Sequence, residues 1–313
     1  MKVAILTQPL LYNYGGILQN YALQAVLKEL GHEPFTLDCR PFLHRSVIQK
    51  NIPRLLSGKP LFGHRLPVFQ QFVSENLSTV PAGRCYKARQ LEGMDAVIVG
   101  SDQVWRSRYN YGTLEAMFLG FAPSFSGPIV AYAASFGLDR WDADERKQAR
   151  CRTLAQRFKA VSVREASGIQ ICREALGVEA ALVPDPVILL QAADYVALCK
   201  DVPPVGEAYT AAYILDDNPA SQEALAGARF PVRRCTSGVE ATLTVPQWIA
   251  LFRDAQEVIT DSFHGAVLAA LLEKPCTLVQ NAARGAERFR LFEAPIDFAA
   301  ARRTGIDFLK KAL

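Results

Sequence analysis

Short apolar runs alternate with helix-patterned segments along the whole chain, and this alternation restricts the fold more than any other feature. The apolar runs are short and often β-branched, as is typical of buried strands. They cover residues 3–7, 35–38, 96–100, 129–135, 161–164, 208–215, 232–235, 257–260 and 276–279. Between them, apolar residues recur at helical spacing in residues 15–30, 142–158, 165–176, 220–228, 246–255 and 263–273. Strands separated by helices form parallel sheets flanked by helices, so we predict an α/β protein.

The alternation is interrupted once by proline-rich stretches and then restarts. Pro184-Asp185-Pro186 and residues 201–206 interrupt the pattern, and a second set of strands and helices follows them. With 313 residues, half of them hydrophobic, the chain can bury more than one core. We therefore predict two Rossmann-like domains that face each other across a cleft, residues 1–200 and 201–313, with a basic insertion at about residues 40–74.

Several classes of protein are not indicated. The seven cysteines are odd in number and scattered, without a Cys-x-x-Cys pair, so we expect neither a disulfide framework nor a metal site, and no cofactor. No apolar run is long enough to cross a bilayer. The opening MKVAILTQPLL faintly resembles a signal peptide but lacks a small-residue cleavage site, so we interpret it as the first strand. We expect a cytoplasmic protein.

Residues 39–74 form a strongly basic segment. They contain six Lys or Arg and no Asp or Glu, with apolar residues interleaved. Such a segment could lie against an anionic membrane surface or receive an anionic substrate. Alternatively, it is a helical insertion whose apolar face joins the core while its basic face is solvated. Nothing in the chain resembles a nucleic-acid-binding module, so no nucleic acid partner is expected.

His264 stands where an apolar strand meets an Ala- and Leu-rich helix. The strand ends in Thr260-Asp261-Ser262, and the helix begins at once. In a parallel sheet this junction lies at the carboxyl edge, where ligands bind. Free N–H groups at a helix start favour an anion, and a histidine there can donate a proton to it. Alternatively, His264 only helps to cap the helix.

A second strand end carries paired glycines. Asn13, Tyr14, Gly15 and Gly16 follow the first strand and open a helix, where glycines let backbone N–H groups approach a ligand. The spacing is neither a dinucleotide fingerprint nor a Walker loop. The other interpretation is a simple tight turn, although polar residues on the first helical turns favour a site.

A third strand end carries Gly100-Ser-Asp-Gln-Val-Trp105. Asp102 or Gln103 could bind sugar hydroxyls there, with Trp105 offering an apolar face. Equally, Ser101 and Asp102 are good turn or helix caps.

Arginines complete the set of strand-end candidates. Arg164 ends the strand at residues 161–164, and Arg284 and Arg288 follow the strand at residues 276–279. Arginine suits bidentate recognition of carboxylate or phosphate, although Arg164 could instead pair with Glu165. One histidine with two or three arginines suits a small, multiply anionic substrate whose reaction needs proton transfer.

Six motifs in this order resemble the polysaccharide pyruvyl transferase family: NYGGILQNYALQ, VIVGSDQVW, YAASFG, SVREASG, VPDPVILL and ITDSFHG. The resemblance covers most of the chain. It implies a GT-B-like fold of two Rossmann-like domains. It also implies transfer of the pyruvyl group of phosphoenolpyruvate onto two hydroxyls of a sugar as a cyclic ketal, with release of phosphate.

The resemblance also implies a functional set. His264 and Arg164 would be catalytic, and a basic residue after the following strand, Arg284 or equally Arg288, would bind the donor. Ser262 and Gly265 flank the histidine in the SFHG motif and would line the same site. The charge of phosphoenolpyruvate matches arginines and a helix N-terminus, and His264 would act as general acid and then base.

Three points stay open from the sequence. Asp261 or Asp102 could activate the sugar hydroxyl. The acceptor could be a surface polysaccharide or its lipid-linked precursor, in which case the basic segment at residues 40–72 would bring the enzyme to the inner face of the membrane. The main alternative is a nucleotide-sugar-dependent glycosyltransferase on the same fold, which would bind a nucleoside diphosphate.

Overall fold

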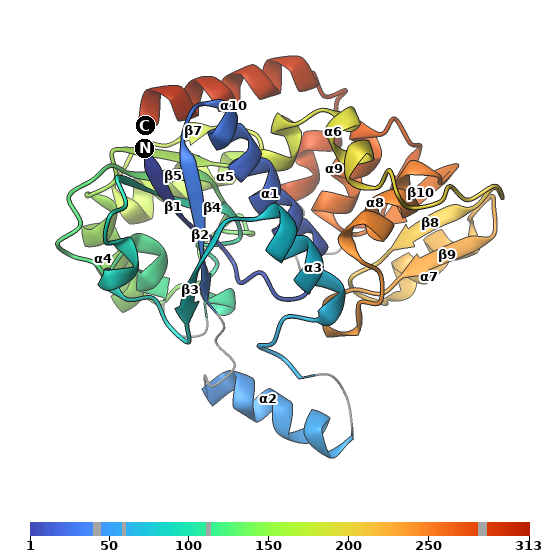
Figure 1. Ribbon diagram of the computed structural model, residues 1–313, viewed down its shortest axis with the longest axis horizontal. Coiled ribbons are helices and arrows are strands. Elements are labelled where there is room, and N and C mark those ends of the chain that lie inside the picture. Colours follow the sequence, from blue (N-terminus) through green and yellow to red (C-terminus); the bar gives the residue numbers. More distant parts are fainter. Residues whose placement is uncertain (40–44, 58–60, 111–113, 281–286) are drawn as a thin grey trace.

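The computed structural model describes residues 1–39, 45–57, 61–110, 114–280 and 287–313 (Figure 1). Its first half is built on a seven-stranded sheet in the order β3-β2-β1-β4-β5-β6-β7, and every neighbouring pair is parallel. The strands are β1 (Lys2–Leu6), β2 (Glu33–Cys39), β3 (Thr79–Gly83), β4 (Ala96–Asp102), β5 (Ile129–Ala134), β6 (Ala160–Val163) and β7 (Ala181–Leu182). The order reverses between β1 and β4, which makes their carboxyl ends a switch point where ligands bind in such sheets.

The second half is built on a four-stranded parallel sheet in the order β11-β10-β8-β9. Its strands are β8 (Thr210–Tyr213), β9 (Val232–Cys235), β10 (Glu257–Thr260) and β11 (Cys276–Leu278). The predicted fold class, two Rossmann-like units as in the GT-B fold, is confirmed by these two parallel sheets. The domain boundary near residue 200 stays a prediction.

Helices flank both sheets, except α2, which extends away from them (Figure 1). They are α1 (Tyr14–Glu29), α2 (Arg45–Leu56), α3 (Pro67–Asn76), α4 (Glu145–Ala155), α5 (Ala166–Ile171), α6 (Ala192–Leu198), α7 (Pro219–Ala226), α8 (Val245–Arg253), α9 (Phe263–Leu271) and α10 (Phe298–Ala312). Shorter turns are η1 (Ala88–Leu91), η2 (Ser107–Tyr109), η3 (Leu114–Phe118), the π-helical η4 (Cys172–Leu176), η5 (Pro186–Leu189), η6 (Gly238–Glu240) and η8 (Glu287–Phe292). Among the described residues, no helix is both long enough and apolar enough to span a membrane.

Local chemistry explains where several helices begin. An Asp, Asn, Thr or Ser side chain accepts a hydrogen bond from the backbone N–H three residues on at Asp144, Asn218, Thr244, Ser262 and Asp297. Such caps stabilise a helix by about 1 kcal/mol each. Helix α1 differs, because within the described part of the chain the Asn13 side chain makes no capping hydrogen bond. The first N–H groups of α1 therefore keep their capacity to bind an anion.

The two halves share one core. The ring of Tyr14, at the start of α1, stacks on Trp248 of α8 with centroids 5.1 Å apart, and its hydroxyl donates to the Leu243 carbonyl at 2.7 Å. A separate apolar cluster, which includes Trp105 and Phe118, covers the opposite face of the first sheet. Burial of Tyr14 in the shared core fixes the start of α1 relative to the second half.

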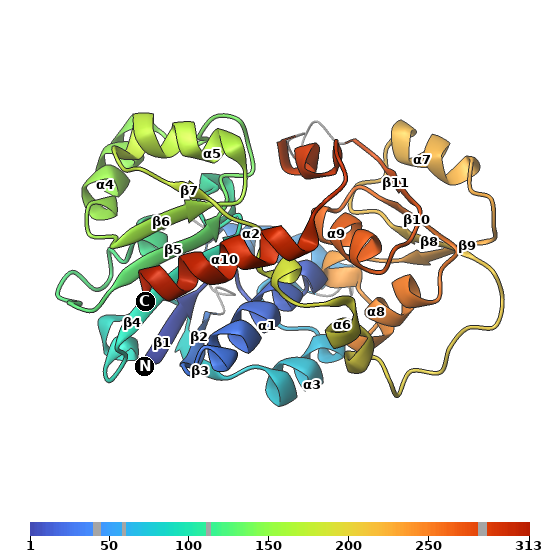
Figure 2. The same ribbon diagram turned by 90° about the horizontal axis from the view of Figure 1, so that it is seen from above.

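The last helix runs back over the first half. Figures 1 and 2 show α10 lying along the first sheet, with the C-terminus near the N-terminus. The Arg302 guanidinium donates to the carbonyls of Leu189 and Leu190, both at 2.7 Å. Gly305 packs closely on Leu189 and on the Tyr132 hydroxyl. Helix α10 thus holds η5, and the segment just before it, in place against β5.

The basic segment divides into two parts in the structure. In α3, Phe69 and Phe72 are buried in the core, as the insertion alternative expects. In α2, by contrast, Ile48, Ile52 and Leu56 are 41%, 56% and 85% exposed. Residues 40–44 and 58–60 lie outside the described residues.

Candidate active site

Two helix N-termini, one from each half, meet at His264. This residue is in the first turn of α9, and its side chain is 8% exposed. A Cβ added at Gly15, in the first turn of α1, would overlap the imidazole ring. The absence of a side chain at Gly15 therefore lets the two helix starts approach each other, with the histidine between them. The sequence suggested that Gly15 makes room for a ligand, and the structure shows that it makes room for His264.

Asp185 is the centre of a buried polar network beside His264. Its Oδ2 atom accepts hydrogen bonds from Arg164 Nη1 at 2.8 Å and from Ser101 Oγ at 2.9 Å. Its Oδ1 atom accepts from the Val187 backbone N–H at 3.0 Å, which caps η5. The carboxylate is fully buried, so each of these donors replaces a lost water contact.

Arg164, at the end of β6, is held by two acids and one aromatic ring. Its Nε atom lies 3.1 Å from Glu165 Oε1, and its guanidinium lies over the Phe263 ring, 4.4 Å from the centroid. Its side chain is only 3% exposed. Burial lowers the pKa of the guanidinium, but Glu165, Asp185 and Asp102 outweigh that effect and raise the pKa above its ordinary value. Arg164 is therefore a fixed positive charge.

The same network keeps Asp185 ionised. Burial raises the pKa of its carboxyl, but the His264 imidazole, the Arg164 guanidinium and the Val187 N–H together hold the pKa well below its usual range. His264 Nε2 lies 3.6 Å from Asp185 Oδ2, close enough for an ion pair when the ring is protonated. Among the described residues, that nitrogen has no hydrogen-bond partner. A small shift of the ring would complete the pair.

This arrangement suits a general acid. The His264 ring lies beside the buried Asp185 carboxylate, 3.6 Å from its Oδ2 atom, at the start of α9. A histidine next to a buried carboxylate is held in one orientation and stabilised as it gains a proton. The His264, Asp185 and Arg164 side chains together can therefore position and supply a proton.

Other predicted residues lie next to this cluster. At Gly16, an added Cβ would come within 3.3 Å of Asn13 Nδ2 and 3.5 Å of Asp102 Oδ2, so both side chains border the start of α1. Ser262 Oγ accepts the Gly265 N–H at 3.3 Å, as a helix cap. An added Cβ at Gly265 would lie 2.6 Å from Thr260 Oγ1, so only glycine fits against β10.

Further candidates lie elsewhere. Tyr14 is in the shared core, and Gln103 Oε1 accepts a hydrogen bond from Arg106 Nη1 at 2.9 Å. Asp261 accepts the backbone N–H groups of residues 215 and 216, at 2.6 and 3.1 Å, which fixes the loop after β8. The expectation for Trp105 is wrong: it is 1% exposed and stacks on Phe118, because its large apolar surface completes the core.

Two arginine candidates cannot be placed. Arg284 lies outside the described residues, and of Arg288 only the backbone, in η8, is described. Asp185 is not among the residues predicted from the sequence, although it lies in the VPDPVILL motif. The available signal was a lone carboxylate inside an otherwise apolar stretch, which must find a partner when that stretch is buried.

The fold and the cluster define the class of protein. It is an α/β protein of two Rossmann-like units, with a histidine and a buried Asp–Arg pair where strand ends and helix starts of both units meet. The chain belongs to the polysaccharide pyruvyl transferase family, whose family model matches residues 13–282.

Solved structures with a similar course of the chain are distant in sequence. A UDP-GlcNAc 2-epimerase from Methanocaldococcus jannaschii, solved with UDP-GlcNAc and UDP, aligns at 12% identity and a TM-score of 0.47, over 100% of this chain and 93% of that chain. A glycosyltransferase from Rickettsia africae aligns at 10% identity and a TM-score of 0.49, over 98% and 93%. An Escherichia coli heptosyltransferase with ADP aligns at 11% identity and 0.39, over 100% and 99%. No curated protein matches the chain in sequence.

Proposed function

We propose that this protein transfers the pyruvyl group of phosphoenolpyruvate onto two hydroxyls of a sugar, as a cyclic ketal, and releases phosphate. The acceptor is a sugar of a surface polysaccharide or of its lipid-linked precursor. The observation that carries the proposal is the position of His264, which lies beside the buried Asp185–Arg164 pair and against the uncapped start of α1. The family membership supports the same reaction class.

The proposed donor site uses fixed positive charge. Phosphoenolpyruvate carries a carboxylate and a phosphate, and the N–H groups at the start of α1 bind anions. Arg164 is paired with Asp185 and Glu165, so it holds the Asp185 carboxylate in place beside His264 and does not bind the donor directly. Arg284 or Arg288 would supply a further guanidinium from the segment after β11.

The chemistry divides into two additions. His264 protonates the methylene carbon of phosphoenolpyruvate, and the adjacent carbon becomes open to attack by the first sugar hydroxyl. The carbon–oxygen bond to phosphate then breaks, and the second hydroxyl adds to close the ketal. Of the two hydroxyl protons, one returns to His264 and the other leaves with the phosphate, so atoms and charge balance. Proton transfer of this kind contributes roughly a hundred- to ten-thousand-fold in rate.

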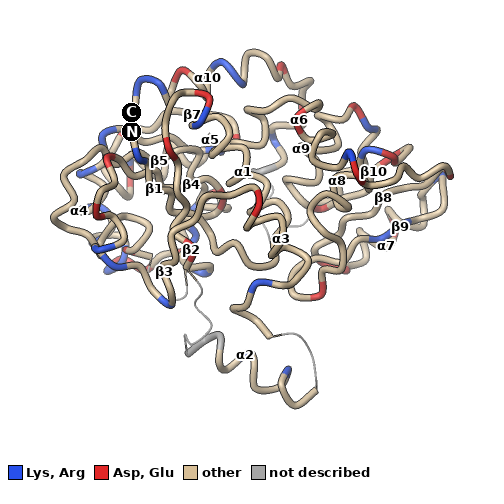
Figure 3. Tube along the Cα trace, in the orientation of Figure 1, with Lys and Arg blue, Asp and Glu red and all other residues tan. Residues whose placement is uncertain are grey.

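Helix α2 supports a second part of the proposal, contact with the inner face of the cell membrane. Ile48, Ile52, Leu55 and Leu56 have the spacing of one helical face and are all exposed. Figures 1 and 3 show α2 extending from the body, without an acidic residue along it. An exposed apolar face beside Lys50 fits an anionic lipid surface. We propose that α2 brings a cytoplasmic enzyme to a lipid-linked acceptor.

A thermal-shift titration with phosphoenolpyruvate, phosphate and nucleoside diphosphates tests the donor. A ligand at about a hundred times its dissociation constant stabilises the native state by roughly 2.7 kcal/mol. We expect stabilisation by phosphoenolpyruvate that shrinks in Arg164→Lys, and phosphate release with an acceptor that is lost in His264→Gln. A response to a nucleoside diphosphate without one to phosphoenolpyruvate would instead favour the glycosyltransferase alternative.

A further inference from the structure

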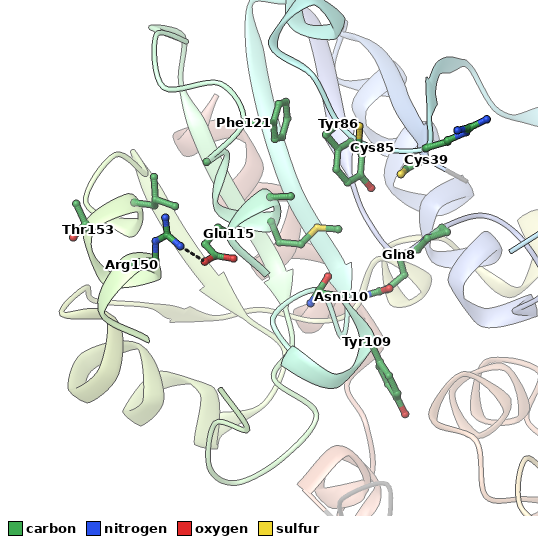
Figure 4. Close-up of a pocket in the computed structure, with 16 residues that line it drawn as sticks. Gln8, Cys39, Cys85, Tyr86, Tyr109, Asn110, Glu115, Phe121, Arg150 and Thr153 are labelled. Carbon is green, nitrogen blue, oxygen red and sulfur yellow. Dashed lines mark ion pairs between the residues drawn. The ribbon is translucent and has the colours of Figure 1, made fainter. Parts of the chain in front are cut away.

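A large cavity lies in the first half, apart from the His264 cluster. Its volume is about 740 Å³, which is in the range of small-molecule sites. It is formed by the loops after β1 and β3 and by the last residue of β2, Cys39, together with η2, η3 and α4 (Figure 4). None of the residues that line it is Arg164, Asp185 or His264. No part of the chemistry described above uses this cavity.

The cavity has one aromatic side and one polar side. Tyr86 and Phe121 stack with centroids 5.5 Å apart and an interplanar angle of 26°. Figure 4 shows these two rings across the cavity from Glu115, Asn110 and Gln8. Glu115 is held by an ion pair with Arg150 at 3.5 Å. Most of the remaining wall is apolar, from residues such as Met117 and Leu154.

A pyranose matches this division. Its C–H faces pack against aromatic rings, and its hydroxyls need carboxylate and amide partners. An alkyl chain fits less well, because it would take the Glu115–Arg150 pair out of water without offering hydrogen bonds in return. The polar side therefore favours a saccharide over a lipid tail.

The loop after β1 and the end of β4 connect the cavity to the His264 cluster. Gln8 Nε2, at the cavity, donates to the Gln103 carbonyl at 2.9 Å. One residue earlier, Thr7 Oγ1 donates to the Ser101 carbonyl at 2.9 Å, and Ser101 Oγ binds Asp185. Short hydrogen bonds therefore fix the position of Gln8, and of a ligand against it, relative to the His264 cluster.

We propose that this cavity binds a pyranose residue of the acceptor glycan. That this saccharide is the acceptor depends on the proposed pyruvyl transfer, whereas saccharide binding in the cavity can be tested independently of that reaction. The wild type is first screened on an array of pyranose oligosaccharides that covers hexoses, N-acetylhexosamines and uronic acids. The best binder is then measured in solution by titration calorimetry with wild type, Phe121→Ala and Glu115→Gln.

We expect Phe121→Ala to weaken saccharide binding by about tenfold, since it removes the aromatic side of the cavity. Glu115→Gln, which keeps the shape and removes the charge, should weaken it as well. Matched controls are Phe230→Ala, a partly buried ring in the other half, and Glu179→Gln, which breaks an exposed ion pair with Arg173. Both controls should bind the saccharide as the wild type does.

The outcomes separate this inference from the proposed function. Saccharide binding that is lost in the cavity variants, while stabilisation by phosphoenolpyruvate persists, supports both. If no saccharide binds, or if Phe121→Ala and Glu115→Gln bind it normally, the cavity assignment is overturned and pyruvyl transfer is unaffected. The cavity assignment would also be overturned if the wild type bound a nucleoside diphosphate or anionic vesicles and Phe121→Ala lost that binding. If the cavity binds the saccharide but phosphoenolpyruvate does not stabilise the protein, the saccharide site is supported and phosphoenolpyruvate is excluded as the donor.

Discussion

Replacing Asp185 by Asn tests the buried network most directly, because the two side chains have the same shape and differ in charge. If the Asn oxygen keeps the Val187 N–H, its NH2 group faces Arg164 Nη1, so two donors meet, and Ser101 Oγ has to turn from donor to acceptor. The guanidinium then retains only Glu165 as a directly bonded acid, at 3.1 Å. The substitution therefore leaves a buried cation partly unpaired.

The cost follows from this geometry. Removing one partner of a buried ion pair destabilises a protein by roughly 3–5 kcal/mol. Because Glu165 still pairs with Arg164, we expect the lower end, about 3 kcal/mol, and a fall in Tm of roughly 6 °C. Urea unfolding of wild type and Asp185→Asn at pH 7 measures the difference. Glu179→Gln, which breaks an exposed ion pair, is the control and should show no measurable change.

The pH dependence gives a second test of the same network. The folded state holds the pKa of Asp185 below the ordinary value of about 3.9, so the carboxylate stabilises the fold above that pH. Its contribution is lost as the pH falls below about 4 toward the folded-state pKa. The stability gap between wild type and Asp185→Asn should therefore narrow in acid. If the free energies of unfolding of wild type and Asp185→Asn differ by less than about 1 kcal/mol at pH 7, or if the difference stays constant down to about pH 3, the Asp185 carboxylate does not stabilise the fold as an ion pair.

Two further predictions concern the helix starts and α2. Gly15→Ala should displace the His264 ring and reduce turnover, measured by phosphate release, at least tenfold. The control Gly16→Ala should keep most activity, because an added Cβ there comes no closer than 3.3 Å to a neighbouring atom. Equal activities of the two variants would contradict the close approach of α1 to His264. Changing Leu55 and Leu56, 69% and 85% exposed, to Ser should leave Tm unchanged and abolish flotation with anionic vesicles; unchanged flotation would remove the membrane contact.

Polar residues inside α1 show what the local sequence leaves open. Their polarity suggested a ligand site. In the structure, Gln19 Nε2 donates to Thr7 Oγ1 at 2.9 Å and Asn20 Oδ1 accepts from Thr36 Oγ1 at 2.8 Å, whereas Gln19 Oε1 and Asn20 Nδ2 have no hydrogen-bond partner among the described residues. The two hydrogen bonds tie α1 to the strands beneath it. A buried polar side chain needs a partner in either case, and the sequence does not say whether that partner is a ligand or a strand.

Elements that depend on weak local signals were also beyond the sequence. Strands β3 and β7 lie at the two edges of the first sheet, and β3 contains a proline, so neither has the apolar run of a central strand. The stretch expected as one helix at residues 165–176 is divided into α5 and the π-helical η4. Packing against the sheet, rather than propensity, decides such segments.

The sequence by itself determined the alternation of the central strands with helices, because apolar periodicity and capping residues act over a few positions. It thereby placed His264 at a helix start and Arg164 at a strand end. Only the tertiary structure decided that these residues share Asp185, 21 residues after the arginine and 79 before the histidine. That meeting depends on how α1, η5 and α9 pack across two sheets, and packing between distant segments leaves no local pattern in the chain.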